Sequence, residues 1–155
     1  MHTVSDLWQQ MLADPAHAVE AKLKIAGVEY GEDQIVRKSL MVYGGLYSTF
    51  GIGNCCARQI EFEIYPQGTI PRQAKIEVYM RLRLGEQVSE WIPKGVFFFS
   101  TRKTDRITGV LSVHGYDAML KAEETWLDSS YDAKTWPMPA ATAVADIAAR
   151  MGVAV

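Results

Sequence analysis

Long apolar runs, a surplus of one charge and a leader-like start are all missing from this chain of 155 residues. Because it has no stretch of about 18 consecutive apolar residues, the sequence predicts no transmembrane helix, and we expect no membrane insertion. The first six residues, MHTVSD, contain neither a basic nor an apolar segment, so we expect no secretory signal. The net charge is −2, and without a dominant basic patch we expect no specific binding of nucleic acid.

Cysteine and histidine are scarce, which limits redox and metal chemistry. The two cysteines, Cys55 and Cys56, are adjacent, and the histidines His2, His17 and His114 are far apart in the sequence. Neighbouring residues of a strand point to opposite faces, so a disulfide between adjacent cysteines would strain the backbone. We expect two reduced thiols, as in a reducing compartment. A metal site needs several ligands close together, so we expect no bound metal and no cofactor.

Recognisable catalytic motifs are also missing. The sequence has no Gly-x-Ser-x-Gly, no His-Glu-x-x-His and no calcium loop. The glycine-rich segment 44–54 invites comparison with a phosphate-binding loop, but it lacks the Lys-Ser/Thr pair of such a loop and no helix pattern follows it. We interpret it as a structural loop that folds back on the core or meets a partner.

Two side-chain groups could still suggest catalysis. Glu61 and Glu63 share one strand face, and with Glu77 on a neighbouring strand they could form a carboxylate pair of the kind that glycoside hydrolases use. His114 precedes Asp117 and could suggest an acid–base pair, but no nucleophile can be placed beside it. Alternating charges are typical of a solvated strand face, and we expect His114 at a surface or subunit contact. We therefore predict no catalytic residues and no enzyme.

Alternation of apolar with polar residues predicts a fold made mainly of β-strands. In segment 74–84 every second residue is apolar, and in segment 55–65 Ile60, Phe62 and Ile64 alternate with glutamates, which indicates one buried and one solvated face. Several short strands joined by short turns form a small barrel or a sandwich. The predicted strands cover residues 21–25, 28–31, 35–43, 55–65, 74–84, 87–92, 96–101 and 107–116, with an exposed turn at 102–106.

Helical patterns flank the predicted strands. Ser5 is a suitable N-cap for a helix over residues 6–13, which packs either on its own domain or on a neighbouring subunit. Asp117 can cap a second short helix, and residues 138–152 form a helix pattern that ends at Gly152. We predict a mainly β fold with added helices (α+β): an N-terminal helix at 1–16, a small antiparallel β-barrel at 17–116, and a helical segment at 117–155. This last segment is the start of a second, incomplete domain, so we expect the chain to be part of a longer protein.

One predicted strand is apolar on both faces. Val96 and Phe98 point to one side of it, and Phe97 and Phe99 point to the other. A strand of this kind is covered on both sides. One cover is the core; the other is either a helix of the same chain or another subunit, since aromatic residues are enriched at interface centres.

The segment 90–120 carries a family resemblance. Its W-I-P-K-G-V-F strand entry, its T-R-K-T-D turn and its G-Y-D-A-M-L-K-A run resemble the N-terminal part of tail-tip hub proteins of tailed bacteriophages and prophages. The resemblance extends from about residue 21 to the end of the chain, and its motifs are structural and not catalytic.

The resemblance implies a function in assembly. Hub proteins of this family form rings in which three chains build a collar of pseudo-sixfold symmetry that joins the tail tube to the tip apparatus. It implies self-association as a trimer, contacts with other tail proteins, and a place in the virion tail after assembly in the bacterial host cytoplasm. We expect the candidate subunit interface to include Tyr47, Phe50, Phe97 and Phe99. The alternatives are a carbohydrate- or cell-wall-binding β-sandwich and part of a tail-associated cell-wall hydrolase.

Overall fold

A computed structural model describes residues 4–44, 58–123 and 137–152 of the chain. Antiparallel β-structure dominates these residues, with helices at both ends of the chain, so the predicted mainly β, α+β class is confirmed. None of the described helices is long and apolar enough to cross a membrane. In chain order the elements are α1 (Asp6–Ala13), β1 (Ala18–Ile25), β2 (Val28–Tyr30), β3 (Met41–Tyr43), β4 (Gln59–Ile64), β5 (Lys75–Leu84), β6 (Gln87–Val88), β7 (Ile92–Thr104), β8 (Leu111–Tyr116), the 3-10 helix η1 (Ala118–Glu123) and α2 (Ala140–Met151).

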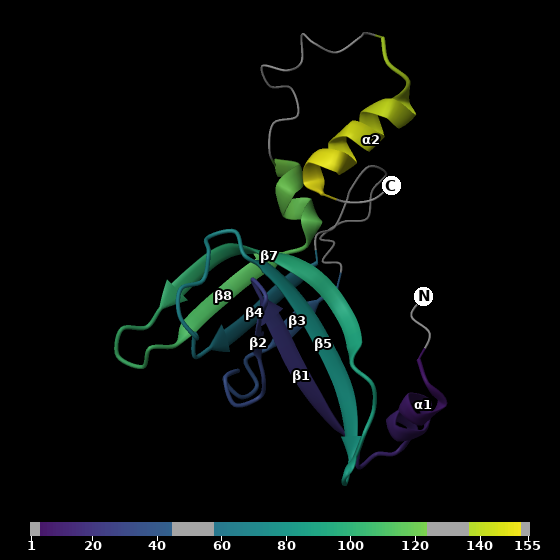
Figure 1. The fold of residues 1–155 in the computed structure, drawn as a ribbon, viewed down its shortest axis with the longest axis vertical. Coiled ribbons are helices and arrows are strands. Elements are labelled where there is room, and N and C mark those ends of the chain that lie inside the picture. The colour runs from purple at the N-terminus through teal and green to yellow at the C-terminus, as the bar shows by residue number, and fades with distance from the viewer. Residues whose placement is uncertain (1–3, 45–57, 124–136, 153–155) are drawn as a thin grey trace.

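The strands form one antiparallel sheet that curls around a core (Figure 1). The order across the sheet is β2-β1-β5-β7-β8-β4-β3, and β6 pairs with β5. The two ends, β2 and β3, do not pair with each other, so the sheet is a partly open barrel. Because the described strands make a single sheet, the two-sheet sandwich alternative is wrong.

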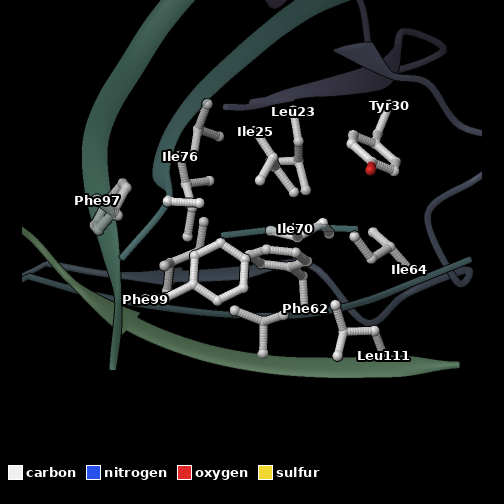
Figure 2. Close-up of a cluster of buried hydrophobic side chains, with 14 of the residues drawn as sticks. Leu23, Ile25, Tyr30, Phe62, Ile64, Ile70, Ile76, Phe97, Phe99 and Leu111 are labelled. Carbon is white, nitrogen blue, oxygen red and sulfur yellow. The ribbon is translucent and has the colours of Figure 1, made fainter. Parts of the chain in front are cut away.

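The concave face of the sheet holds the main hydrophobic core (Figure 2). Alternation along β4 and β5 puts every second side chain inside, as the sequence predicts. The rings of Phe62 and Phe99 meet edge to face with their centroids 6.4 Å apart. Tyr30 is fully buried too, and its hydroxyl oxygen accepts a hydrogen bond from the backbone N–H of Gln67 at 3.3 Å. The members of this core come from all the long strands and so fix the curl of the sheet.

A second, smaller cluster attaches the N-terminal helix. The side chain of Ser5 caps α1 by accepting a hydrogen bond from the backbone N–H of Trp8, which confirms the predicted cap and helix bounds. Trp8 and Met11 pack against Leu82 of β5 and Ile92 of β7. Of the two predicted alternatives for this helix, the structure has the one in which it packs on its own chain.

The predicted strand at 35–43 is mostly wrong, because a bulge interrupts it. Ile35 bridges to Ile64, and Met41 lies opposite Glu61. The chain thus advances six residues from 35 to 41 while β4 advances only three, from 61 to 64, so the first segment has extra residues. The extra residues turn at Lys38, whose φ of 65° is in the left-handed region. The connection between β2 and β3 therefore closes part of the barrel without a regular strand.

The hairpin of β7 and β8 is longer than the sequence predicts. Residues 102–104 belong to β7 and not to the turn, which instead runs from Asp105 to Val110. The side chain of Asp105 accepts a hydrogen bond from the backbone N–H of Ile107 at 2.8 Å, and Gly109 has a φ of 71°. These local turn residues therefore set where the chain reverses direction.

The C-terminal helices follow the predicted pattern. Asp117 accepts the backbone N–H of Met119 at the start of η1, which is a 3-10 helix instead of an α-helix. The helix α2 ends at Gly152 in the left-handed conformation, as expected for a helix C-cap. It lies against η1, and none of its residues is buried (Figure 1). The domain boundaries remain predictions.

Candidate functional site

Two of the four aromatic residues expected at a subunit interface lie in the hydrophobic core. Phe97 and Phe99 are only 0% and 5% exposed and belong to the core of their own chain (Figure 2). A buried ring cannot contact another subunit, so the interface prediction is wrong for both residues. Tyr47 and Phe50 lie outside the described residues. The alternation along β7 was read correctly, but it could not tell which of the two faces was the core.

The other face of β7 is covered in part by the same chain. Val96 is exposed, whereas the ring of Phe98 lies 4.3 Å from the Nζ of Lys121 in η1. Phe98 and Lys121 also line one cavity with Arg150 of α2. A helical cover from the same chain therefore accounts for the second apolar face at Phe98.

A polar groove lies on the convex side of β4 and β8. It measures about 560 Å³ and is bordered by the bulge before β3 and by the end of β7. The strand register places two pairs of polar residues side by side on its floor: Glu61 opposite His114, and Glu63 opposite Ser112. The bulge adds Arg37, Lys38 and Ser39 to the rim of the groove, which therefore carries charges of both signs.

The polar groove does not contain a nucleophile activated by histidine. The hydroxyl of Ser112 donates to Glu63 Oε1 at 2.9 Å, whereas His114 Nε2 lies 4.0 Å from Glu61 Oε1. The ring of His114 also contacts the ring of Tyr116, with the centroids 4.8 Å apart. Each residue is thus paired across the strands, as on an ordinary polar sheet face.

The other suggested catalytic pairs are separated. Glu77 lies on β5, and β7 and β8 stand between it and Glu61 on β4, so the proposed carboxylate pair does not form. Asp117 accepts hydrogen bonds from the backbone N–H groups of Arg58 and Met119 and is not hydrogen-bonded to His114. Among the described residues, no group of three or more His, Cys, Asp and Glu side chains could hold a metal ion.

A buried carboxylate on the convex side of β1 was not foreseen. Glu20 is 8% exposed and forms ion pairs with Arg81 and Arg83 of β5. The hydrogen bond from Arg83 is the main cause that holds the pKa of Glu20 below its ordinary value, and Arg81 adds to it. Trp91 lies beside this pair, with Arg81 Cζ 4.5 Å from its ring centroid. The sequence shows these opposite charges, but it does not show the register of β1 and β5 that brings them together.

Two glycines of segment 90–120 have packing roles. Gly95 has a φ of 151°, and a Cβ there would lie 3.0 Å from both an Arg58 guanidinium nitrogen and the Phe97 ring. Gly115 is tighter still, because its Cβ would lie 2.6 Å from the carbonyl oxygen of Phe98. Gly95 and Gly115 therefore allow close approach of neighbouring atoms to the backbone.

The edge strand β3 is an apolar surface. Met41 and Val42 are 45% and 37% exposed, and Tyr43 completes a strand without charged residues. Edge strands usually carry charges or proline that prevent pairing with other chains. In the part of the chain that is described, no strand lies on the outer side of β3. This edge is thus suited to pairing with another protein chain.

Comparison of the sequence and fold with protein-family models, curated proteins and solved structures gives no match.

Proposed function

We propose that this chain is a non-enzymatic structural component of a phage or prophage tail. It forms part of the ring-like hub that joins the tail tube to the tip apparatus at the tail tip or baseplate. The proposal rests on the resemblance of segment 90–120 to hub proteins. It is supported by the packing roles of Gly95, Gly115 and Asp117 in that segment, which are the roles expected of structural motifs.

The observation that carries the assembly function is the uncharged edge strand β3. Ring formation requires each copy to present a surface that excludes water when it meets its neighbour. Met41 and Val42 offer exposed apolar side chains beside a backbone edge that no described strand pairs with. Pairing of such an edge with a neighbouring chain adds backbone hydrogen bonds to the burial of apolar surface. We therefore propose a subunit contact at β3 that does not include Phe97 or Phe99.

The test is the solution mass of the chain, measured by light scattering after size exclusion over a range of concentrations. We expect a trimer or a hexamer for the natural sequence. Met41→Lys places a charge at the edge on the convex face, opposite Glu61 and away from the core, and should shift the mass to that of a monomer.

Ile107→Lys is the matched control, because Ile107 is 96% exposed in the turn between β7 and β8. It should leave the mass unchanged. A natural chain that stays monomeric at every concentration would contradict self-assembly by this chain. An oligomer that both variants preserve would contradict the role of β3.

A second candidate function is binding of a cell-wall carbohydrate. The observation that favours it is the polar groove, where Glu61 has a partly exposed carboxylate available to sugar hydroxyl groups. Titration with cell-wall polysaccharide in a calorimeter tests it. Saturable binding that Glu61→Gln weakens would favour this function, and absence of heat would exclude the polysaccharide used.

A further inference from the structure

The barrel has an open seam along β1. On one side β1 pairs with β5 over its whole length, from Ala18 to Ile25. On the other side β2 pairs only with residues 23–25. Among the described residues, no backbone hydrogen bond reaches residues 18–22 from that second side. Five of the eight residues of β1 therefore have no strand partner on that side in the described part of the chain.

A groove lined by both aliphatic and charged residues fills the space beside this free edge. It measures about 560 Å³ and lies between Val19 and Ala21 of β1 and the connection before β3, which contributes Ile35, Val36 and Leu40. Val19 is 56% exposed although it shares a face with the buried Leu82, its partner on β5. The groove thus combines aliphatic walls with unpaired backbone, which is what an added strand requires.

The rim of this groove carries positive charge. Arg37 and Lys38 are exposed on the connection, and neither forms an ion pair with a described residue. Glu32 also lines the groove, so its two cations and one carboxylate leave a net positive charge. Carboxylates on a bound segment would therefore meet two cations that form no ion pair with a described residue.

We propose that this seam binds an extended segment of a partner protein, in which small aliphatic residues alternate with acidic residues. The segment adds to β1 as a strand of about five residues, since each residue of a strand advances roughly 3.3 Å. Its aliphatic side chains face Val19 and Ala21, and its carboxylates face Arg37 and Lys38. The inference goes beyond the hub function and does not require ring formation.

The shape of the seam favours a free segment over a second copy of this chain. Protein bounds the groove on both sides, with β1 on one and residues 35–40 on the other. Every described strand already has a neighbour in the sheet. A described strand from a second copy would bring that neighbour against one wall, whereas a single extended segment fits between the two.

The probe is a fluorescein-labelled peptide with the core Val-Glu-Val-Glu-Val and short Gly-Ser ends, titrated with the full chain by fluorescence anisotropy. We expect saturable binding that Val19→Lys weakens at least tenfold. The double variant Arg37→Glu with Lys38→Glu should weaken it similarly and should instead prefer a peptide with Lys in place of Glu. Ile107→Lys, at an exposed turn, should bind as the natural chain does.

Backbone engagement has its own readout. Amide exchange measured by NMR should slow within residues 18–22 when the peptide is bound, and a peptide with Ser in place of Val should produce no such change. The proposal is overturned if no binding saturates below about 1 mM peptide, or if both seam variants bind the peptide as tightly as the natural chain does. It is also overturned if the natural chain self-associates and Val19→Lys abolishes that association, because the seam is then filled by a second copy.

Discussion

Glu20 and Arg81 face each other across β1 and β5, with Glu20 Oε2 2.6 Å from Arg81 Nε. The other oxygen of the same carboxylate accepts from Arg83. One buried acid thus holds two arginines on the convex face, beside the ring of Trp91. The pairing ties β1 to β5 next to the open seam.

Glu20→Gln should destabilise the chain, because the side chain keeps its size but loses the charge that both arginines require. Removing one partner of a completely buried ion pair costs roughly 3–5 kcal/mol of stability. Because Arg81 and Arg83 are partly exposed, we expect a loss of about 1–3 kcal/mol. Urea denaturation followed by circular dichroism measures the change. Glu29→Gln is the control, since Glu29 pairs with Lys22 at the surface and should contribute about 0.5 kcal/mol or less. Equal effects of the two substitutions would contradict the proposed role of Glu20.

Gly115→Ala should destabilise the hairpin of β7 and β8, because the added methyl group would press on the carbonyl oxygen of Phe98. Overpacking of this kind costs about 1–3 kcal/mol. Gly44→Ala is matched to it, since nothing lies within 4 Å of a Cβ there, and it should change the free energy of unfolding by less than about 0.5 kcal/mol. Thermal unfolding of the two variants compares them directly, and a neutral Gly115→Ala would refute the close contact.

Phe97 and Phe98 are neighbours with opposite surroundings, which gives a matched pair of substitutions. Phe97→Ala empties a fully buried site and should cost about 3–5 kcal/mol. Phe98→Ala removes a partly exposed ring that contacts Lys121 and should cost about 1 kcal/mol. Chemical denaturation measures both. A larger loss for Phe98→Ala would mean that the core lies on the other face of β7.

The attachment of α1 should weaken in acid. The backbone N–H and the hydroxyl of Ser5 donate to the Glu90 carboxylate at 2.8 and 2.7 Å, and they lower the pKa of Glu90, the backbone N–H most. A lowered pKa in the folded state means that this stabilisation is present above the ordinary pKa of about 4.3 and is lost as the pH falls through the folded-state value.

Comparison with Glu90→Gln isolates this contribution from that of the other carboxylates. The difference in the free energy of unfolding between the two proteins should be largest near neutral pH and should shrink as the pH falls below about 4. Because the chain has four tryptophans, the indole N–H resonance of Trp8, which packs α1 on the sheet, reports the local change in an NMR spectrum. A difference that stays constant with pH would show that the Glu90 carboxylate does not hold α1.

Local patterns were enough to predict several elements. Ser5 as a cap and the apolar stripe with Trp8 and Met11 define α1 within the sequence itself. Alternation in β4 identifies its inner face in the same way. These features depend on residues a few positions apart, and the periods of helix and strand are visible at that range.

Other features depended on partners far along the chain. The bulge before β3 arises from pairing with β4, and segment 35–43 by itself looked like a continuous strand. The interface assignment of Phe97 and Phe99 failed because a strand with two apolar faces gives no sign of which face is the core. The open seam, likewise, exists only because β2 is shorter than β1.

The sequence by itself thus determined the mainly β class, the flanking helices and their caps, and the inner faces of strands with one polar side. Only the tertiary structure decided the order of strands, the pairing of Glu20 with Arg81 and Arg83, and the side of β7 that enters the core. The physical reason is the separation along the chain of the residues that interact. Periodicity and capping act between near neighbours, whereas register and burial follow from the curl of the whole sheet, which is set by contacts between distant residues.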